Sequence, residues 1–217
     1  IMMATRQGVV KKTPLLEYSH PRTGGIIAVN LDEGDKLITV SLTDGKQDVL
    51  LASRNGKSIR FREEDARPMG RVTRGVRGMT LEDDDVVIGM VIVNEQFTDS
   101  TLFTVTENGF GKRTELTEYR RQSRGGKGVI TIKTNERNGC VVDIKQVTDE
   151  NDLMLITDQG KIIRMPVAGF SVIGRNTQGV RLMVTEESER IVAVARLAEK
   201  EDADEGPDDE DFPVEDE

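Results

Sequence analysis

The chain has 217 residues, of which 30 are Lys or Arg and 39 are Asp or Glu, so its formal net charge is −9. Its only cysteine, Cys140, excludes an intramolecular disulfide, and the lack of a signal peptide or long apolar segment predicts a cytoplasmic protein without a membrane partner. Its only histidine, His20, has no second histidine with which to form a catalytic pair or a Cys/His metal site. We therefore expect no catalytic residue, metal or cofactor within this chain.

Two sets of glycines recur in one register. The hairpin glycines, at intervals of 48, 53 and 51 residues, are Gly8, Gly56, Gly109 and Gly160. The second glycines, at intervals of 50, 53 and 51 residues, are Gly25, Gly75, Gly128 and Gly179. Such a period is typical of propeller blades, small antiparallel sheets that bury their faces only against neighbours. We predict an all-β domain over residues 1–198, with blades at about 1–48, 49–101, 102–152 and 153–198.

Each repeat is predicted to contain four strands in the same order. An apolar strand (residues 1–4, 49–52, 102–105 and 153–156) leads into the hairpin. Asn-Gly at 55–56 and 108–109 favours a type I′ turn, in which both central residues have positive φ. A return strand and a polar loop follow. A short strand at the second glycine, such as Gly25-Ile26-Ile27, then precedes a last strand (residues 37–42, 86–93, 141–147 and 191–197).

The composition changes sharply near Glu199. Residues 199–217 hold 12 acidic residues and one lysine, a net charge of −11, which leaves +2 for residues 1–198. So acidic a segment cannot bury enough apolar surface to fold, so we predict a disordered tail. It is expected to compete with a polyanion for basic residues of the domain, the alternative being a solubilising extension.

Basic residues cluster on the return strands and in the loops before the second glycines. The candidate contacts are Lys11, Lys12, Arg22, Lys57, Arg60, Arg71, Arg74, Lys112, Arg113, Arg120, Arg121, Arg124, Lys127, Lys161, Arg164 and Arg175. One basic residue stands four positions after each hairpin glycine, and rotation of the repeats is expected to place these four on one rim: Lys12, Arg60, Arg113 and Arg164. No aromatic residues interleave with them, which favours duplex phosphates over stacked single-strand bases. The alternative is that they are solvated charges protecting exposed sheet edges.

The loop at residues 122–128 is the most basic and glycine-rich of these loops. Gly125 and Gly126 are expected to let backbone amides approach a phosphate, while Arg124 and Lys127 supply charge. A tight turn that happens to be basic explains the same residues equally well.

Several segments resemble the C-terminal domain of the bacterial DNA gyrase A protein. They lie at residues 109–114 (GFGKRT), 127–133 (KGVITIK), 136–139 (ERNG) and 173–180 (IGRNTQGV). The resemblance covers nearly the whole chain. It implies a β-pinwheel of four-stranded antiparallel blades that exchange strands with their neighbours, with four of the family's six blades present here. The loop at 122–128 matches six of seven positions of the family's heptapeptide, with Ser123 in place of an arginine, but in a later blade than the family has it.

The resemblance also implies a function and partners. The family wraps duplex DNA around a basic perimeter, associates with the N-terminal cleavage core of gyrase A and with gyrase B in a heterotetramer, and acts in the cytoplasm on chromosomal DNA. ATP and Mg²⁺ belong to the whole enzyme, a type II topoisomerase that introduces negative supercoils. Two alternatives remain: the corresponding C-terminal domain of topoisomerase IV, and a propeller that serves as a protein-interaction scaffold.

Overall fold

The computed structural model describes residues 1–82, 84–93 and 99–197, and the predicted acidic tail at 199–217 lies outside these ranges. The strands are β1 Met2–Thr5, β2 Val9–Lys12, β3 Leu37–Ser41, β4 Asp48–Ser53, β5 Lys57–Arg62, β6 Val76–Arg77, β7 Val87–Val93, β8 Thr101–Thr106, β9 Phe110–Glu115, β10 Val129–Ile130, β11 Val141–Val147, β12 Asp152–Thr157, β13 Ile162–Pro166, β14 Val180–Arg181 and β15 Ile191–Leu197. Short 3₁₀ helices follow the return strands: η1 Leu15–Tyr18, η2 Glu63–Asp65, η3 Leu116–Glu118 and η4 Val167–Gly169.

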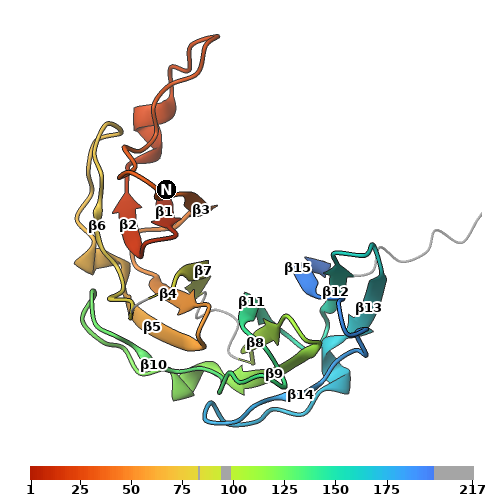
Figure 1. Ribbon diagram of the computed structural model, residues 1–217. Coiled ribbons are helices and arrows are strands. Elements are labelled where there is room, and N and C mark those ends of the chain that lie inside the picture. Colours follow the sequence, from red (N-terminus) through yellow and green to blue (C-terminus); the bar gives the residue numbers. More distant parts are fainter. Residues whose placement is uncertain (83, 94–98, 198–217) are drawn as a thin grey trace, which may run out of the picture.

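Four antiparallel sheets follow one another around an open arc (Figure 1). Their strand orders are β3-β1-β2-β6, β10-β5-β4-β7, β11-β8-β9-β14 and β13-β12-β15. The short strands β6, β10 and β14 lie on the outer side of the arc, and β7, β11 and β15 lie toward its inner side (Figure 1). The predicted all-β, propeller-like architecture is confirmed.

The outer strand of each four-stranded sheet comes from the following repeat. Strand β6 of the second repeat pairs with β2 of the first, β10 of the third with β5, and β14 of the fourth with β9. The strand exchange implied by the resemblance is therefore confirmed. We call β6, β10 and β14 the exchange strands.

The prediction of four strands per copy is wrong in the first repeat, where the segment Gly25-Ile26-Ile27 is not a strand. The fourth repeat has the four predicted strands, but its β14 belongs to the third sheet, so the fourth sheet has three strands. Each exchange strand pairs with the return strand of the preceding repeat. Within the described residues, no return strand comes before β1 to pair with residues 25–27, and no exchange strand pairs with β13. Consistently, an added Cβ would meet nothing within 4 Å at Gly25 or Gly160, whereas at Gly75 and Gly109 it would lie 2.5 and 2.4 Å from a carbonyl oxygen of the neighbouring repeat.

The hairpin turns differ from the predicted type I′ geometry. In each turn the glycine amide donates to the carbonyl three residues earlier, as Gly56 does to Ser53 at 3.1 Å. The hairpin glycines have φ between 81° and 84°, but Asp84 is the only non-glycine residue of the described ranges with positive φ. Asn55 and Asn108 are thus in ordinary conformations, and the glycine alone supplies the left-handed residue that closes a three-residue hairpin loop.

The hydrophobic core lies between successive sheets. Alternate residues of a central strand face opposite neighbours: Val49 and Leu51 of β4 pack with the first sheet, and Leu50 and Ala52 pack with the third. All four are buried. A further cluster, which includes Phe103 of β8, joins the third sheet to the fourth. Each sheet is therefore stabilised by packing against the sheets before and after it in the arc.

Candidate nucleic-acid interface

The loops that lead into the exchange strands run along the outer side of the arc (Figure 1). We call residues 67–75, 120–128 and 171–179 the perimeter loops. Each ends at a second glycine with positive φ. An added Cβ on these glycines would lie 2.5 Å from the carbonyl oxygen of Val10, 2.2 Å from that of Ser58 and 2.6 Å from that of Gly111. Glycine is required there because each loop passes directly against a return strand of the preceding sheet.

Two of the predicted DNA contacts, Lys11 and Lys112, are buried. The prediction that these return-strand lysines lie at the surface is therefore wrong. Each residue is 1 % exposed. The Lys11 ammonium donates to the carbonyls of Ala28, at 2.6 Å, and Arg71. The Lys112 ammonium donates to the carbonyls of Gly174, at 2.7 Å, and Arg175. Both lysines therefore hold perimeter loops from inside.

The burial of Lys112 has a pH-dependent consequence. Desolvation lowers the pKa of Lys112 to about 8 from the 10.5 of a free lysine. Between pH 8 and pH 10.5 the unfolded chain binds more protons than the folded chain, so the free energy of unfolding rises with pH. Below pH 8 Lys112 is protonated in both states, and the full cost of burying its charge lowers the stability of the folded chain. We expect the stability of the wild type relative to Lys112→Met to increase by about 1 to 2 kcal/mol from pH 7 to pH 10.

This expectation is checked by urea unfolding of both proteins at the two pH values. Lys36→Met is the matched control, because Lys36 is exposed, and its difference from the wild type is expected to stay constant. A constant difference for Lys112→Met as well would contradict the lowered pKa.

The predicted band of return-strand cations is wrong for three of its four members. Lys12 lies 3.8 Å from the buried carboxylate of Glu63, Arg60 donates through Nε to Asp48 at 2.6 Å, and Arg113 donates to Asp149 at 2.5 Å and to the Val167 carbonyl. These cations lie largely within the protein and join the hairpin to the adjoining loops. Arg164 is different, because its side chain is 55 % exposed although it pairs with Asp152.

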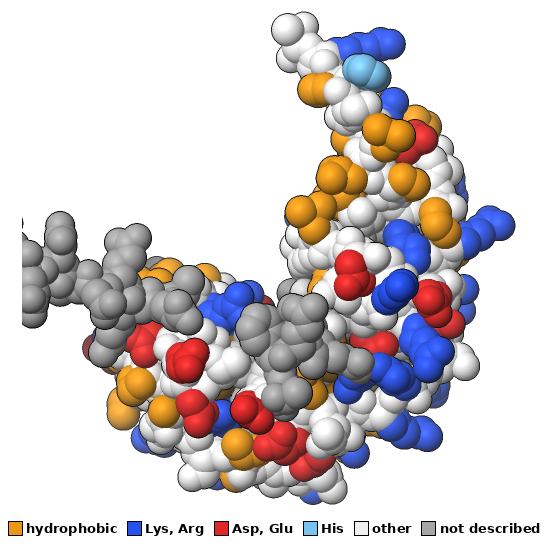
Figure 2. Space-filling view, turned by 180° about the vertical axis from the view of Figure 1, so that it is seen from behind, with side chains coloured by type: hydrophobic (Ala, Val, Ile, Leu, Met, Phe, Trp, Pro, Cys, Tyr) orange, Lys and Arg blue, Asp and Glu red, His pale blue; other side chains and the backbone are white. Residues whose placement is uncertain are grey.

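The perimeter loops carry the more accessible candidates. The side chain of Arg74 is 74 % exposed and pairs only at the surface with Asp32. Arg120 and Lys127 of these loops are exposed, and so is Arg22, which lies outside them, before Gly25. Figure 2 shows Lys and Arg side chains gathered along the part of the convex outer edge that the first two sheets form. This surface, more than the return strands, presents positive charge to solvent.

The remaining candidates have acidic or backbone partners. Lys57 pairs with Glu82, Arg121 with Asp48 and Lys161 with Glu189, each at 2.6 Å. Three arginines of the perimeter loops donate to backbone carbonyls: Arg71, Arg124 and Arg175.

The glycines of the loop at 122–128 have a structural role. The Gly125 amide donates to the Gly78 carbonyl at 2.8 Å, and the Thr80 amide donates to the Gly126 carbonyl at 3.0 Å. The expectation that the Gly125 amide contacts a phosphate is therefore corrected: that donor is already used between the second and third repeats.

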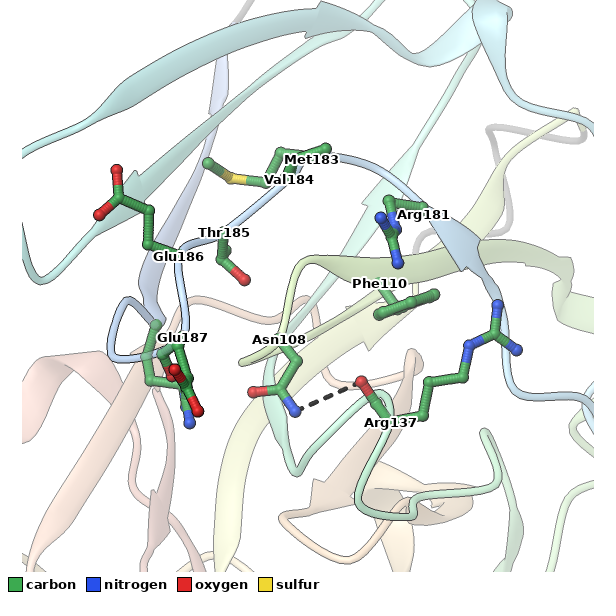
Figure 3. Close-up of a pocket in the computed structure, with 10 residues that line it drawn as sticks. Asn108, Phe110, Arg137, Arg181, Met183, Val184, Thr185, Glu186 and Glu187 are labelled. Carbon is green, nitrogen blue, oxygen red and sulfur yellow. Dashed lines mark hydrogen bonds between the residues drawn. The ribbon is translucent and has the colours of Figure 1, made fainter.

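Sequence reasoning missed two exposed cations, Lys133 and Arg137, which follow the second exchange strand, β10. The guanidinium groups of Arg137 and Arg181 lie 4.8 and 5.3 Å from the centre of the Phe110 ring, in a pocket that Glu186 and Glu187 also line (Figure 3). Such contacts hold a guanidinium in place while leaving its charge at the surface. The segment after β10 has the composition of a polar turn, so no sequence signal set these two residues apart.

The sequence profile described as DNA gyrase C-terminal domain, beta-propeller, matches residues 1–44, 47–94, 100–148 and 151–198. The chain belongs to this family.

Relatives of this gyrase C-terminal domain include the DNA gyrase A protein of Klebsiella oxytoca, 49 % identical over 94 % of this chain, and that of Escherichia coli strain K12, 46 % identical over 93 % of it. The chain spans 23 % of the length of each.

Solved structures resemble the domain in fold. The C-terminal domain of DNA topoisomerase IV superposes with a TM-score of 0.85 and 26 % identity, covering 90 % of this chain and 61 % of that one. A DNA gyrase A C-terminal domain superposes with a TM-score of 0.81 and 24 % identity, covering 91 % and 65 %. The higher identity to relatives named as gyrase A favours the gyrase interpretation over topoisomerase IV.

The described ranges contain neither a helix long and apolar enough to cross a membrane nor a group of three or more His, Cys, Asp or Glu residues able to hold a metal ion.

Proposed function

We propose that this domain binds duplex DNA along its convex outer edge and bends it, as part of a DNA gyrase. The observation that carries the proposal is the concentration of exposed lysines and arginines on the outer side of an open arc (Figure 2). Because the perimeter loops recur with the repeats, cations such as Arg74 and Lys127 are presented at successive points of one curve. A curved row of positive charge fits the backbone of a bent double helix.

Binding of this kind depends on phosphates and DNA shape, not on base sequence. Bending a segment of 20 to 30 base pairs costs roughly 1 to 6 kcal/mol, which contacts along the edge must offset. In the whole enzyme, such a bend would bring a second stretch of the same DNA to the cleavage core. ATP-driven strand passage, with Mg²⁺, would then introduce negative supercoils.

The proposed partners are the N-terminal cleavage core of gyrase A and the gyrase B protein, in a heterotetramer in the cytoplasm on chromosomal DNA. The family membership and the named relatives support this assignment. The chemistry of strand cleavage and ATP hydrolysis is assigned to those other parts of the enzyme.

The salt dependence of DNA binding tests the phosphate contacts. With about six phosphates engaged, log K against log salt has a slope near −5. Replacing both Arg74 and Lys127 by glutamine is expected to reduce the steepness by about two units and to weaken binding at 0.1 M salt by roughly tenfold to fiftyfold. Gel shifts or fluorescence anisotropy at several salt concentrations measure both quantities.

Lys36→Gln is the matched control, because it removes one exposed charge beside the inner strand β3. Its slope and affinity are expected to match the wild type. A wild-type slope near zero would contradict the phosphate-contact proposal, whatever the variants do.

A further inference from the structure

Three arginines occupy one position of the perimeter loops. Arg71, Arg124 and Arg175 each stand four residues before a second glycine, and each donates through Nη1 to the carbonyl two residues after the second glycine of the preceding repeat. The acceptors are Ile27, at 2.8 Å, Arg77, and Ile130, at 2.7 Å. The same bond thus occurs three times along the outer side of the arc.

Two of these bonds connect neighbouring sheets. Arg124 precedes β10, which belongs to the second sheet, and its acceptor Arg77 lies in β6 of the first. Arg175 precedes β14 of the third sheet, and its acceptor Ile130 lies in β10 of the second. Each bond therefore joins one perimeter loop to the exchange strand of the sheet before it.

A backbone bond accompanies each arginine bond. The amide five residues after a second glycine donates to the carbonyl two residues before the next second glycine: Asn30 to Thr73 at 3.0 Å, Thr80 to Gly126 at 3.0 Å, and Lys133 to Thr177 at 2.8 Å. Two hydrogen bonds therefore link each pair of consecutive segments: one from a backbone amide and one from a charged guanidinium group. Hydrogen bonds with a charged partner are the stronger kind.

The guanidinium groups are also held from other sides. Arg124 donates through Nε to the Asp65 carbonyl at 3.2 Å. Arg175 lies 5.9 Å from the centre of the Tyr119 ring and 3.7 Å from a carboxylate oxygen of Glu118. The Arg71 and Arg175 carbonyls accept bonds from the buried lysines Lys11 and Lys112. These arginines thus differ from Arg74, whose partner is a surface carboxylate.

We propose that Arg124 and Arg175 are positioning residues, which fix the angle between neighbouring sheets and so set the curvature of the outer edge, while Arg71 makes the equivalent bond to a segment that is not a strand. The DNA-bending consequence rests on the proposed function, whereas the structural claim does not. In this role they align the cations that meet phosphates and do not meet phosphates themselves.

Hydrogen exchange in the absence of DNA tests the structural claim. Arg124→Gln is expected to speed exchange of the Thr80 amide about tenfold and leave Lys133 unchanged, while Arg175→Gln does the reverse. This crossed pattern separates a local link from general destabilisation, which would speed both amides together. Arg74→Gln, the matched control with the same charge change, is expected to alter neither amide by more than about twofold.

DNA binding provides the second measurement. Arg124→Gln and Arg175→Gln are each expected to keep the wild-type salt slope within about half a unit while reducing the bend measured by fluorescence transfer between DNA ends. A slope reduced by about one unit together with unchanged Thr80 and Lys133 exchange would identify phosphate contacts and overturn the proposal. If the domain fails to bind DNA, the proposed function falls, and the exchange pattern still decides the structural claim.

Discussion

Gly128→Ala is expected to destabilise the domain by about 2 to 5 kcal/mol. Gly128 has φ of 76°, and an added Cβ would lie 2.2 Å from the Ser58 carbonyl oxygen. The left-handed conformation costs a non-glycine residue about 1 to 2 kcal/mol, and forcing an atom into a packed contact costs about 1 to 3 kcal/mol more. Relief of the contact would separate β10 from β5, so the loss is expected in urea unfolding and in amide exchange of that strand pair.

Gly25 provides a control with the same backbone cost. Its φ is 79°, but an added Cβ would meet nothing within 4 Å. Gly25→Ala is expected to lose only the conformational part, about 1 to 2 kcal/mol. Equal losses in the two variants would show that the close approach to Ser58 does not contribute.

Asp48→Ala is expected to cost about 3 to 5 kcal/mol. The Asp48 side chain is 2 % exposed, and its Oδ2 accepts bonds from Nε of both Arg60 and Arg121 at 2.6 Å. Removing the carboxylate takes away the acceptor that lies 2.6 Å from Nε of Arg60, whose side chain is 11 % exposed. Breaking a buried ion pair is among the most destabilising changes in proteins.

Asp152 holds the same place in the fourth repeat and serves as the control. Its Oδ2 accepts a bond from Arg164 Nε at the same 2.6 Å, but the side chains are 18 % and 55 % exposed. Because solvent screens this pair, Asp152→Ala is expected to cost about 1 kcal/mol or less. Denaturant unfolding of both variants measures the difference, and similar losses would refute the role assigned to burial.

The repeats, the central strands and the hairpin positions could be predicted from sequence because they depend on neighbouring residues. The apolar run before Gly56 and the basic strand after it indicate a hairpin without knowledge of the rest of the chain. The predicted turn type is wrong because Asn-Gly suits two hairpin geometries, and the sequence does not show whether Asn55 has positive φ.

The site was harder to predict because its contacts join distant residues. Lys112 bonds to a loop 62 and 63 residues away, and no local pattern indicates that partner. One signal was present: side chains alternate along a strand, so the adjacent Lys11 and Lys12 point to opposite faces of the sheet and cannot both be exposed when one face is covered by a neighbouring sheet. Among the predicted contacts in the perimeter loops, Arg74, Arg120 and Lys127 are exposed, and their contact with DNA stays a prediction.

Each contact between repeats named above joins two consecutive repeats, so within the described residues these contacts do not depend on how many units the array contains. Tandem duplication or excision of one unit, at equivalent points, would leave each surviving junction with the partners it already has: a glycine against a return strand, and an exchanged strand beside it. Gene rearrangement could therefore lengthen or shorten such an array, and with it the convex outer edge, without requiring new contacts between repeats.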